Sequence, residues 1–204
     1  MFKNKLLLLL AGACLGLPLE ATTILNTYPD GPTAYTNAFV LEAQTFTAPA
    51  DTVLSSFQFQ MFAALGQTVQ LEVFLWSAGG PVGSSLFTSA SMARINATQD
   101  FLVSNINLSL TQGDLYGAVI DSGGYYSFNA AFNTNRNSYT GGNMWLVDQG
   151  STTWNTFQTD NLLFQATFVA TQDSPVPEPD AFLLMGAGLT TLALLRRRRS
   201  GLYS

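Results

Sequence analysis

The sequence lacks histidine altogether and has a single cysteine, Cys14, close to its N-terminus. Neither a Ser/His/Asp nor a Cys/His catalytic set can therefore be assembled, and a zinc site of the Cys/His type is excluded as well. One cysteine also cannot form a disulfide within the chain. These absences predict a protein that is not an enzyme and that holds no metal and no cofactor.

Charge is also scarce, because only 10% of the 204 residues are charged, against roughly a quarter in a typical soluble domain. Six of the eight cations lie at the two chain ends: Lys3, Lys5, Arg196, Arg197, Arg198 and Arg199. Residues 22–173 hold ten acids and only two arginines, a net charge of −8. This middle part has no basic footprint for DNA or RNA, so we expect no nucleic-acid partner.

The N-terminal residues have the layout of a secretory signal peptide. Two lysines precede the apolar run Leu6–Leu10, and the small residues Ala11–Cys14 follow it. The lysines are expected to stay cytoplasmic while the apolar run enters the membrane. We predict a signal peptide at residues 1–21, used by the Sec export machinery and removed by signal peptidase after Ala21. Cleavage after Ala13 and lipidation of Cys14 are the alternatives, although Ala11 stands where a lipobox usually has a large aliphatic residue.

The C-terminal residues predict a linker and a membrane segment. Residues 173–180 are a polar linker broken by three prolines, and residues 181–195 carry no charge. Fifteen helical residues span ~22 Å of a hydrocarbon core that is ~30 Å thick, and snorkelling arginines can extend that reach. Arg196–Arg199 follow directly and should remain cytoplasmic. We therefore predict a single membrane helix with its arginine cluster at residues 181–199, followed by a tail at residues 200–204.

Three features in this order resemble the PEP-CTERM sorting signal: Pro177-Glu178-Pro179, the apolar segment, and the arginine cluster. The resemblance implies export by a Gram-negative bacterium, transient anchoring in the inner membrane, and processing by an exosortase. Pro177, Glu178 and Pro179 would then be the recognition element for that enzyme. The family is linked to exopolysaccharide and to biofilm or floc matrix. The resemblance thus implies an exported structural protein of the cell surface or extracellular matrix, with exopolysaccharide as a further partner.

Residues 22–172 show the period-two pattern of β-strands. Apolar and polar residues alternate from Val69 to Leu75, from Phe57 to Met61 and from Ile106 to Leu110, and glycine- or proline-rich turns separate such runs. Residues 115–120 are apolar on both alternating sets, which predicts a strand covered on both faces. With no convincing amphipathic helix before residue 181, the fold class predicted is all-β. We expect a jelly-roll-like antiparallel β-sandwich at residues 22–172.

The order of several motifs in this middle part resembles the choice-of-anchor exported domains, in particular the R type. The motifs are Thr23–Thr27, Gln44–Pro49, Val73–Leu86 and Gly113–Val119. The resemblance implies a β-sandwich ectodomain carried on an interchangeable surface-sorting signal. It supplies no catalytic residues.

Three tryptophans, Trp76, Trp145 and Trp154, are candidates for stacking on a sugar ring. Flat aromatic rings with Asn and Gln nearby can grip a pyranose by stacking and hydrogen bonding. The alternative is that the rings cover the second face of the sandwich or a loop cluster. A carbohydrate-binding, lectin-like surface module is accordingly the alternative function.

The acids of the middle part mostly fall at expected strand ends or turns, where Asp bonds to the local backbone. A polysaccharide hydrolase would need two carboxylates about 5–10 Å apart across one cleft, and this remains the third functional hypothesis. Asp121-Ser122-Gly123-Gly124 could lend ligands to calcium, but it lacks the dense Asp-x-Asp pattern of a dedicated loop.

Overall fold

A computed structural model of the protein describes residues 22–36, 39–63, 68–93, 97–123, 128–134 and 139–170. These residues belong to one compact unit. The predicted signal peptide, the linker with its motif, the membrane segment and the tail lie outside them. Among the described residues, none forms a helix with the length and apolar character needed to cross a membrane.

The described residues form fourteen strands and one short 3₁₀ helix. The elements are β1 (Thr22–Asn26), η1 (Tyr28–Asp30), β2 (Ala34–Tyr35), β3 (Phe39–Thr47), β4 (Val53–Ala63), β5 (Thr68–Ser77), β6 (Gly80–Thr88), β7 (Met92–Ala93), β8 (Ala97–Ser109), β9 (Leu115–Asp121), β10 (Phe128–Asn133), β11 (Met144–Asp148), β12 (Trp154–Phe157), β13 (Asn161–Leu162) and β14 (Phe164–Val169).

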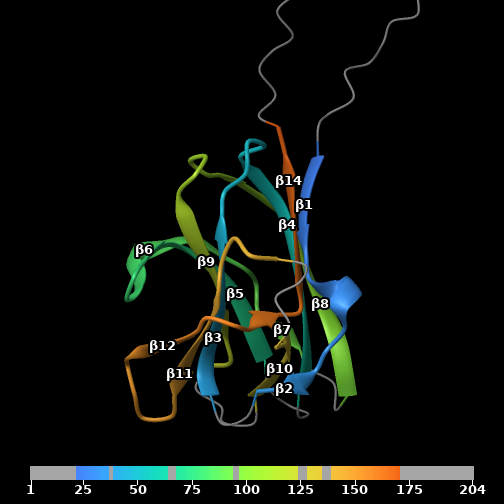
Figure 1. Ribbon diagram of the computed structural model, residues 1–204, viewed down its shortest axis with the longest axis vertical. Coiled ribbons are helices and arrows are strands. Elements are labelled where there is room, and N and C mark those ends of the chain that lie inside the picture. Colours follow the sequence, from blue (N-terminus) through green and yellow to red (C-terminus); the bar gives the residue numbers. More distant parts are fainter. Residues whose placement is uncertain are drawn as a thin grey trace, which may run out of the picture. The chain divides into compact units, whose positions relative to one another are not determined.

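These strands build two antiparallel sheets that pack face to face (Figure 1). The first sheet has the order β1-β14-β4-β10-β13, with β2 paired to β10 and β8 paired to β4. The second has the order β12-β11-β3-β9-β5-β6, with β7 paired to β5. This arrangement confirms the predicted all-β sandwich.

An aromatic core holds the two sheets together. Phe46 on β3 of the second sheet packs edge-on against Phe168 on β14 of the first, with ring centroids 5.7 Å apart. On the first sheet, Phe57 stacks on Phe164 at 5.6 Å and 10° between ring planes. All four rings are fully buried. Burial of a phenylalanine contributes about 1.5–3 kcal/mol, so this core is the main source of cohesion between the sheets.

The alternation predicted most of the inward-facing residues correctly. Phe57, Phe59 and Met61 on β4 are fully buried, and Val69, Leu71 and Val73 on β5 are at most 1% exposed. Leu75, expected on the same buried face, was predicted wrongly and is 37% exposed. The pairing of β5 with β9 runs without a shift to Leu75, so Leu75 stays on the side of Val73. It lies where the pairing with β6 is irregular, because extra residues of β6 stand between the partners of Val73 and Leu75.

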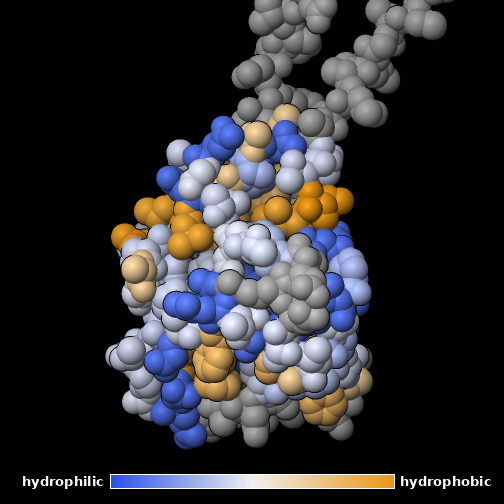
Figure 2. Space-filling model, viewed as in Figure 1, coloured by the Kyte–Doolittle hydropathy of each residue, from blue (hydrophilic) through white to orange (hydrophobic). Residues whose placement is uncertain are grey.

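Some large apolar side chains stay on the surface of the described part. They include Ile24, Val82, Leu86 and Leu102, with exposures between 45% and 59%. Figure 2 shows apolar residues in patches that interrupt the more polar surface of the visible face. Apolar surface is ordinary for a folded domain, because apolar atoms contribute roughly half or more of its accessible surface.

Candidate functional site

The three tryptophans singled out in the sequence come together on the outer face of the second sheet. Trp76 packs edge-to-face against Trp145 at 5.6 Å between ring centroids and against Trp154 at 5.0 Å. Trp76 and Trp145 are 5% and 6% exposed, whereas Trp154 is partly exposed. The rings thus pack on one another in a second apolar cluster that includes Ala43 and Val119. Stacking on a sugar stays a prediction for these residues.

A glycine on the neighbouring strand makes room for this cluster. Trp76 on β5 lies over Gly117 on β9, and a Cβ at Gly117 would overlap the atoms Cε3 and Cζ3 of the indole. Any side chain at this position would therefore push Trp76 away from the sheet.

The contact between Trp154 and Trp76 shows that β12 curls over the outer face of its sheet. Three strands, β11, β3 and β9, separate β12 from β5 in the sheet order. Strands lie about 4.8 Å apart, so a flat sheet would keep the two tryptophans well out of contact. Trp154 instead also lies against Gly80, at the start of β6. The β11–β12 hairpin consequently forms one wall over this face.

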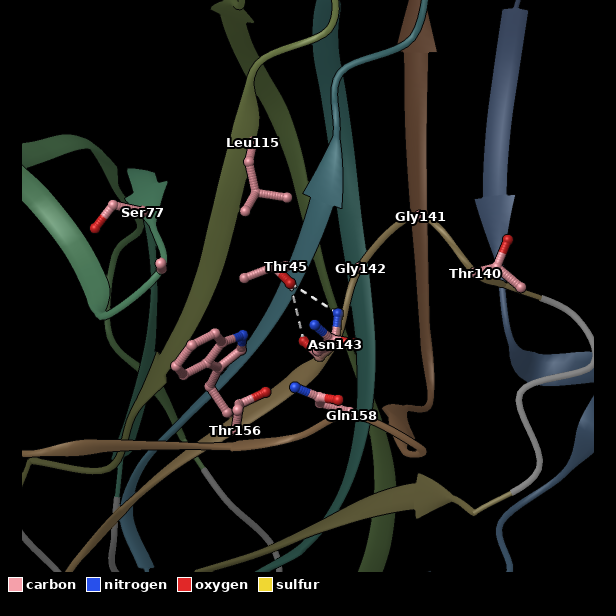
Figure 3. Close-up of a pocket in the computed structure, with 11 residues that line it drawn as sticks. Thr45, Ser77, Leu115, Thr140, Gly141, Gly142, Asn143, Thr156 and Gln158 are labelled. Carbon is pink, nitrogen blue, oxygen red and sulfur yellow. Dashed lines mark hydrogen bonds between the residues drawn. The ribbon is translucent and has the colours of Figure 1, made fainter.

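A pocket of about 420 Å³ lies under that wall (Figure 3). Its lining comes from β3, β9, β11 and β12, from the turn after β5, and from the loop at residues 140–143. The principal side chains are Thr45, Leu115, Asn143, Trp145, Thr156 and Gln158. None of the described residues that line it is charged. A volume in this range is typical of small-molecule sites, which span ~300–1,000 Å³.

Hydrogen bonds fix the loop that closes one side of the pocket. The Thr45 hydroxyl donates to the carbonyl of Asn143 at 3.1 Å and accepts from the backbone N–H of Asn143 at 2.8 Å. The Thr47 hydroxyl donates to the carbonyl of Gly141 at 3.1 Å. Gly142 packs so closely on the backbone of Thr45 that a Cβ there would overlap the Thr45 carbonyl. The loop at residues 140–143 therefore has its shape before any ligand arrives.

Two indole N–H groups of the tryptophan cluster have no acceptor. Nε1 of Trp76 and Nε1 of Trp145 are buried and make no hydrogen bond with any group that the structure describes. A buried donor without a partner costs about 1–3 kcal/mol. Of the two residues, Trp145 lines the pocket.

The carboxylates lie elsewhere. Among the described residues, no acid lines the pocket, and no group of three or more His, Cys, Asp or Glu side chains is placed to hold a metal ion. Asp121 accepts the backbone N–H of Gly123 at 2.7 Å, in agreement with the expected turn chemistry. Glu42 is fully buried, and desolvation raises the pKa of its carboxyl to about 8.

The pKa values of two tyrosine hydroxyls are also raised. Burial raises the pKa of Tyr139 to about 12, and its hydroxyl accepts the backbone N–H of Thr47 at 3.3 Å. Burial, with Asp100 nearby, raises the pKa of Tyr28 well above its usual value. Both hydroxyls stay protonated at neutral pH, so they act as neutral hydrogen-bonding groups.

The sequence had pointed to Trp145 but not to the rest of the pocket. Thr45, Thr156 and Gln158 are ordinary polar residues on or beside strands, and nothing in their spacing marks them. They meet because the β11–β12 hairpin curls over the sheet, which is a long-range effect without a local sequence signal. The Gly141-Gly142-Asn143 turn was the one visible signal near this site.

The sorting residues form the second candidate site. Pro177, Glu178, Pro179 and Arg196–Arg199 lie outside the described residues. A family model for the PEP-CTERM protein-sorting motif matches residues 175–199, which confirms the resemblance. The chain therefore carries a PEP-CTERM sorting motif. The motif marks an exported protein that an exosortase sorts through the membrane to the cell surface.

The fold has counterparts among solved structures. The clostridial cysteine protease Cwp84, in a form obtained after propeptide cleavage, matches with a TM-score of 0.56 at 14% identity, over 74% of this chain and 40% of that chain. The cysteine protease and lectin-like domains of Cwp84, a surface layer associated protein of Clostridium difficile, match with a TM-score of 0.49 at 14% identity, over 67% and 33%. The chain thus spans less than half of either solved chain, and the likeness shows the fold alone. A comparison with curated proteins finds no match.

Proposed function

We propose that the protein is a non-enzymatic structural component of the extracellular matrix of a Gram-negative bacterium, associated with exopolysaccharide in a biofilm or floc. The observation that carries this proposal is the sorting motif at residues 175–199 on a chain whose described residues form a β-sandwich. The sandwich is the part that would remain outside the cell after an exosortase has acted near Pro177-Glu178-Pro179. Signal peptidase and the Sec machinery are the partners expected at the N-terminus.

The composition of the sandwich supports a role outside the cytoplasm. Residues 22–173 contain no cysteine and no histidine and have a net charge of −8. A domain without thiols can fold in an oxidising compartment without disulfide formation or rearrangement. Its cohesion comes from the aromatic core between the two sheets.

The sorting step is tested by the double variant Pro177→Ala with Glu178→Ala. The full-length protein should accumulate in the inner membrane, because the processing enzyme loses its recognition element. Cell fractionation with immunoblotting would measure the ratio of membrane-bound to surface protein, and we expect at least a tenfold rise. Asp173→Ala with Ser174→Ala, just before the motif, is the control and should be sorted normally. Wild-type surface levels of the motif variant would overturn the proposal.

The matrix role is tested by removing the protein from its own cells. We expect the same polysaccharide yield and chain length but a weaker floc or biofilm, measured by rheology of the isolated matrix. The hydrolase hypothesis makes a different prediction. Under it, purified protein incubated with that polysaccharide would release new reducing ends. Detection of such ends would contradict a structural role.

A further inference from the structure

We propose that the pocket beneath the β11–β12 hairpin binds uncharged sugar units of a polysaccharide. This inference rests on the proposed placement of the protein in an exopolysaccharide matrix and names the site that would make the contact. Four observations carry it. They are the uncharged lining, the polar side chains of Thr156 and Gln158, the apolar part of the lining, and the loop at residues 140–143 that is fixed before binding.

The charge of the lining selects the class of ligand. Among the described residues, no lysine, arginine, aspartate or glutamate lines the pocket. A carboxylated, sulfated or amino sugar would lose part of its hydration on entry and would gain no opposite charge in return. A neutral polyhydroxylated molecule avoids that cost, so the lining favours uncharged sugars over charged ones.

Two side chains at the mouth are available to bind hydroxyl groups. Thr156 and Gln158 are exposed, and neither side chain makes a hydrogen bond with the part of the chain that the structure describes. A threonine hydroxyl and a glutamine amide each offer both donors and acceptors, which suits the paired donor and acceptor character of sugar hydroxyls. Figure 3 shows these two side chains close to Thr45 and Asn143.

Apolar surface completes the match. Leu115 and Trp145 add apolar lining that can cover the C–H face of a sugar ring. The Nε1–H of Trp145 is itself buried, so the indole offers the pocket its ring surface and not its donor.

The rigidity of the pocket favours binding of a weakly interacting ligand. The double hydrogen bond between Thr45 and Asn143 and the close packing of Gly142 hold the loop in place before binding. Less ordering is then required when the ligand enters, so more of the contact energy appears as affinity.

The test uses the full chain purified in detergent micelles and titrated by isothermal calorimetry. The probes are the neutral disaccharides cellobiose, maltose and lactose, with digalacturonic acid and chitosan dimer as charged counterparts. We expect at least one neutral disaccharide to bind, and to bind at least tenfold more tightly than both charged probes. Absence of binding by every neutral disaccharide at millimolar concentration, or preference for a charged one, would overturn the inference.

The variant Thr156→Val with Gln158→Leu locates the site. It keeps side-chain size but removes the polar groups, and we expect the affinity for the neutral disaccharide to fall about tenfold or more. Gln149→Leu with Thr152→Val changes two exposed residues of the β11–β12 turn outside the pocket and should bind as wild type does. Equal affinities for the two variants would place binding elsewhere and refute the inference. Surface delivery of the pocket variant, measured in cells, is a separate readout, so a failed pocket leaves the sorting proposal standing.

Discussion

At the scale of single residues, Glu42 is the group whose chemistry departs furthest from the ordinary. Its carboxyl is fully buried in the protein interior, where the Thr36 hydroxyl donates a hydrogen bond to Oε1. Oε2 has no partner among the described residues. Desolvation raises the pKa from its usual 4.5 to about 8, and the hydrogen bonds from Thr36 and the Ala130 backbone lower it only in part. Glu42 is therefore a neutral acid at pH 7 in the folded protein.

This shift makes the stability of the sandwich depend on pH. Between pH 4.5 and about 8 the folded state holds a proton on Glu42 that the unfolded chain has released. The free energy of unfolding should therefore fall as the pH rises through this window, by up to ~1.4 kcal/mol per pH unit. Glu42→Gln should remove that slope and exceed wild type in stability at pH 8. Urea unfolding at pH 5, 6.5 and 8 measures the free energy of unfolding of both proteins across this window.

Glu72→Gln is the matched control for this experiment. Glu72 lies partly exposed on β5, so its replacement should leave the wild-type pH dependence in place. Parallel pH profiles for wild type and Glu42→Gln would contradict the assignment of the slope to Glu42.

At the scale of elements, the packing of β5 on β9 depends on the absence of a side chain at Gly117. Gly117→Ala should displace Trp76 and loosen its contacts with Trp145 and Trp154. We expect a loss of about 1–3 kcal/mol in the free energy of unfolding, together with a red shift of tryptophan fluorescence as the rings become exposed. Chemical denaturation and emission spectra would measure both.

Gly79→Ala provides the comparison, because a Cβ at Gly79 would meet no atom within 4 Å. Its stability should stay within about 0.5 kcal/mol of wild type. If Gly117→Ala were equally harmless, the close packing of Trp76 on β9 would not contribute to stability.

The strands show how far the sequence predicts this fold. Phe57, Phe59 and Met61 alternate strictly with glutamines, and the structure buries all three because one side of β4 faces the opposite sheet. Leu75 follows the same rule and stays on that side of β5, but it lies at the irregular part of the pairing with β6 and is exposed. Such irregularities depend on the partner strand and leave no trace in the alternation of a single segment.

The pocket illustrates the same limit for the candidate site. Local patterns identified Trp76, Trp145 and Trp154 but not their mutual contacts, since these join β5, β11 and β12 across the sheet. The sorting motif behaves differently, because its three parts are contiguous in the sequence and can be recognised without a structure.

At the scale of the whole molecule, the chain combines an acidic sandwich with cationic ends. The net charge of −5 is the sum of −8 for residues 22–173, six cations near the two ends, and three further acids, Glu20, Glu178 and Asp180. Sorting at residues 175–199 would remove the arginine cluster, and export would remove Lys3 and Lys5. The protein left at the surface would then have few cations and no cysteine. The absence of thiols suits its proposed matrix role, because such a domain can fold outside the cytoplasm without forming disulfides.

The most direct test of this account is the intact mass of the protein recovered from the cell surface or matrix, with its C-terminal peptide sequenced by mass spectrometry. Processing by an exosortase predicts a mature chain that ends close to Pro177-Glu178-Pro179 and lacks residues 181–199. Surface protein that still carries the apolar segment and Arg196–Arg199 would contradict it.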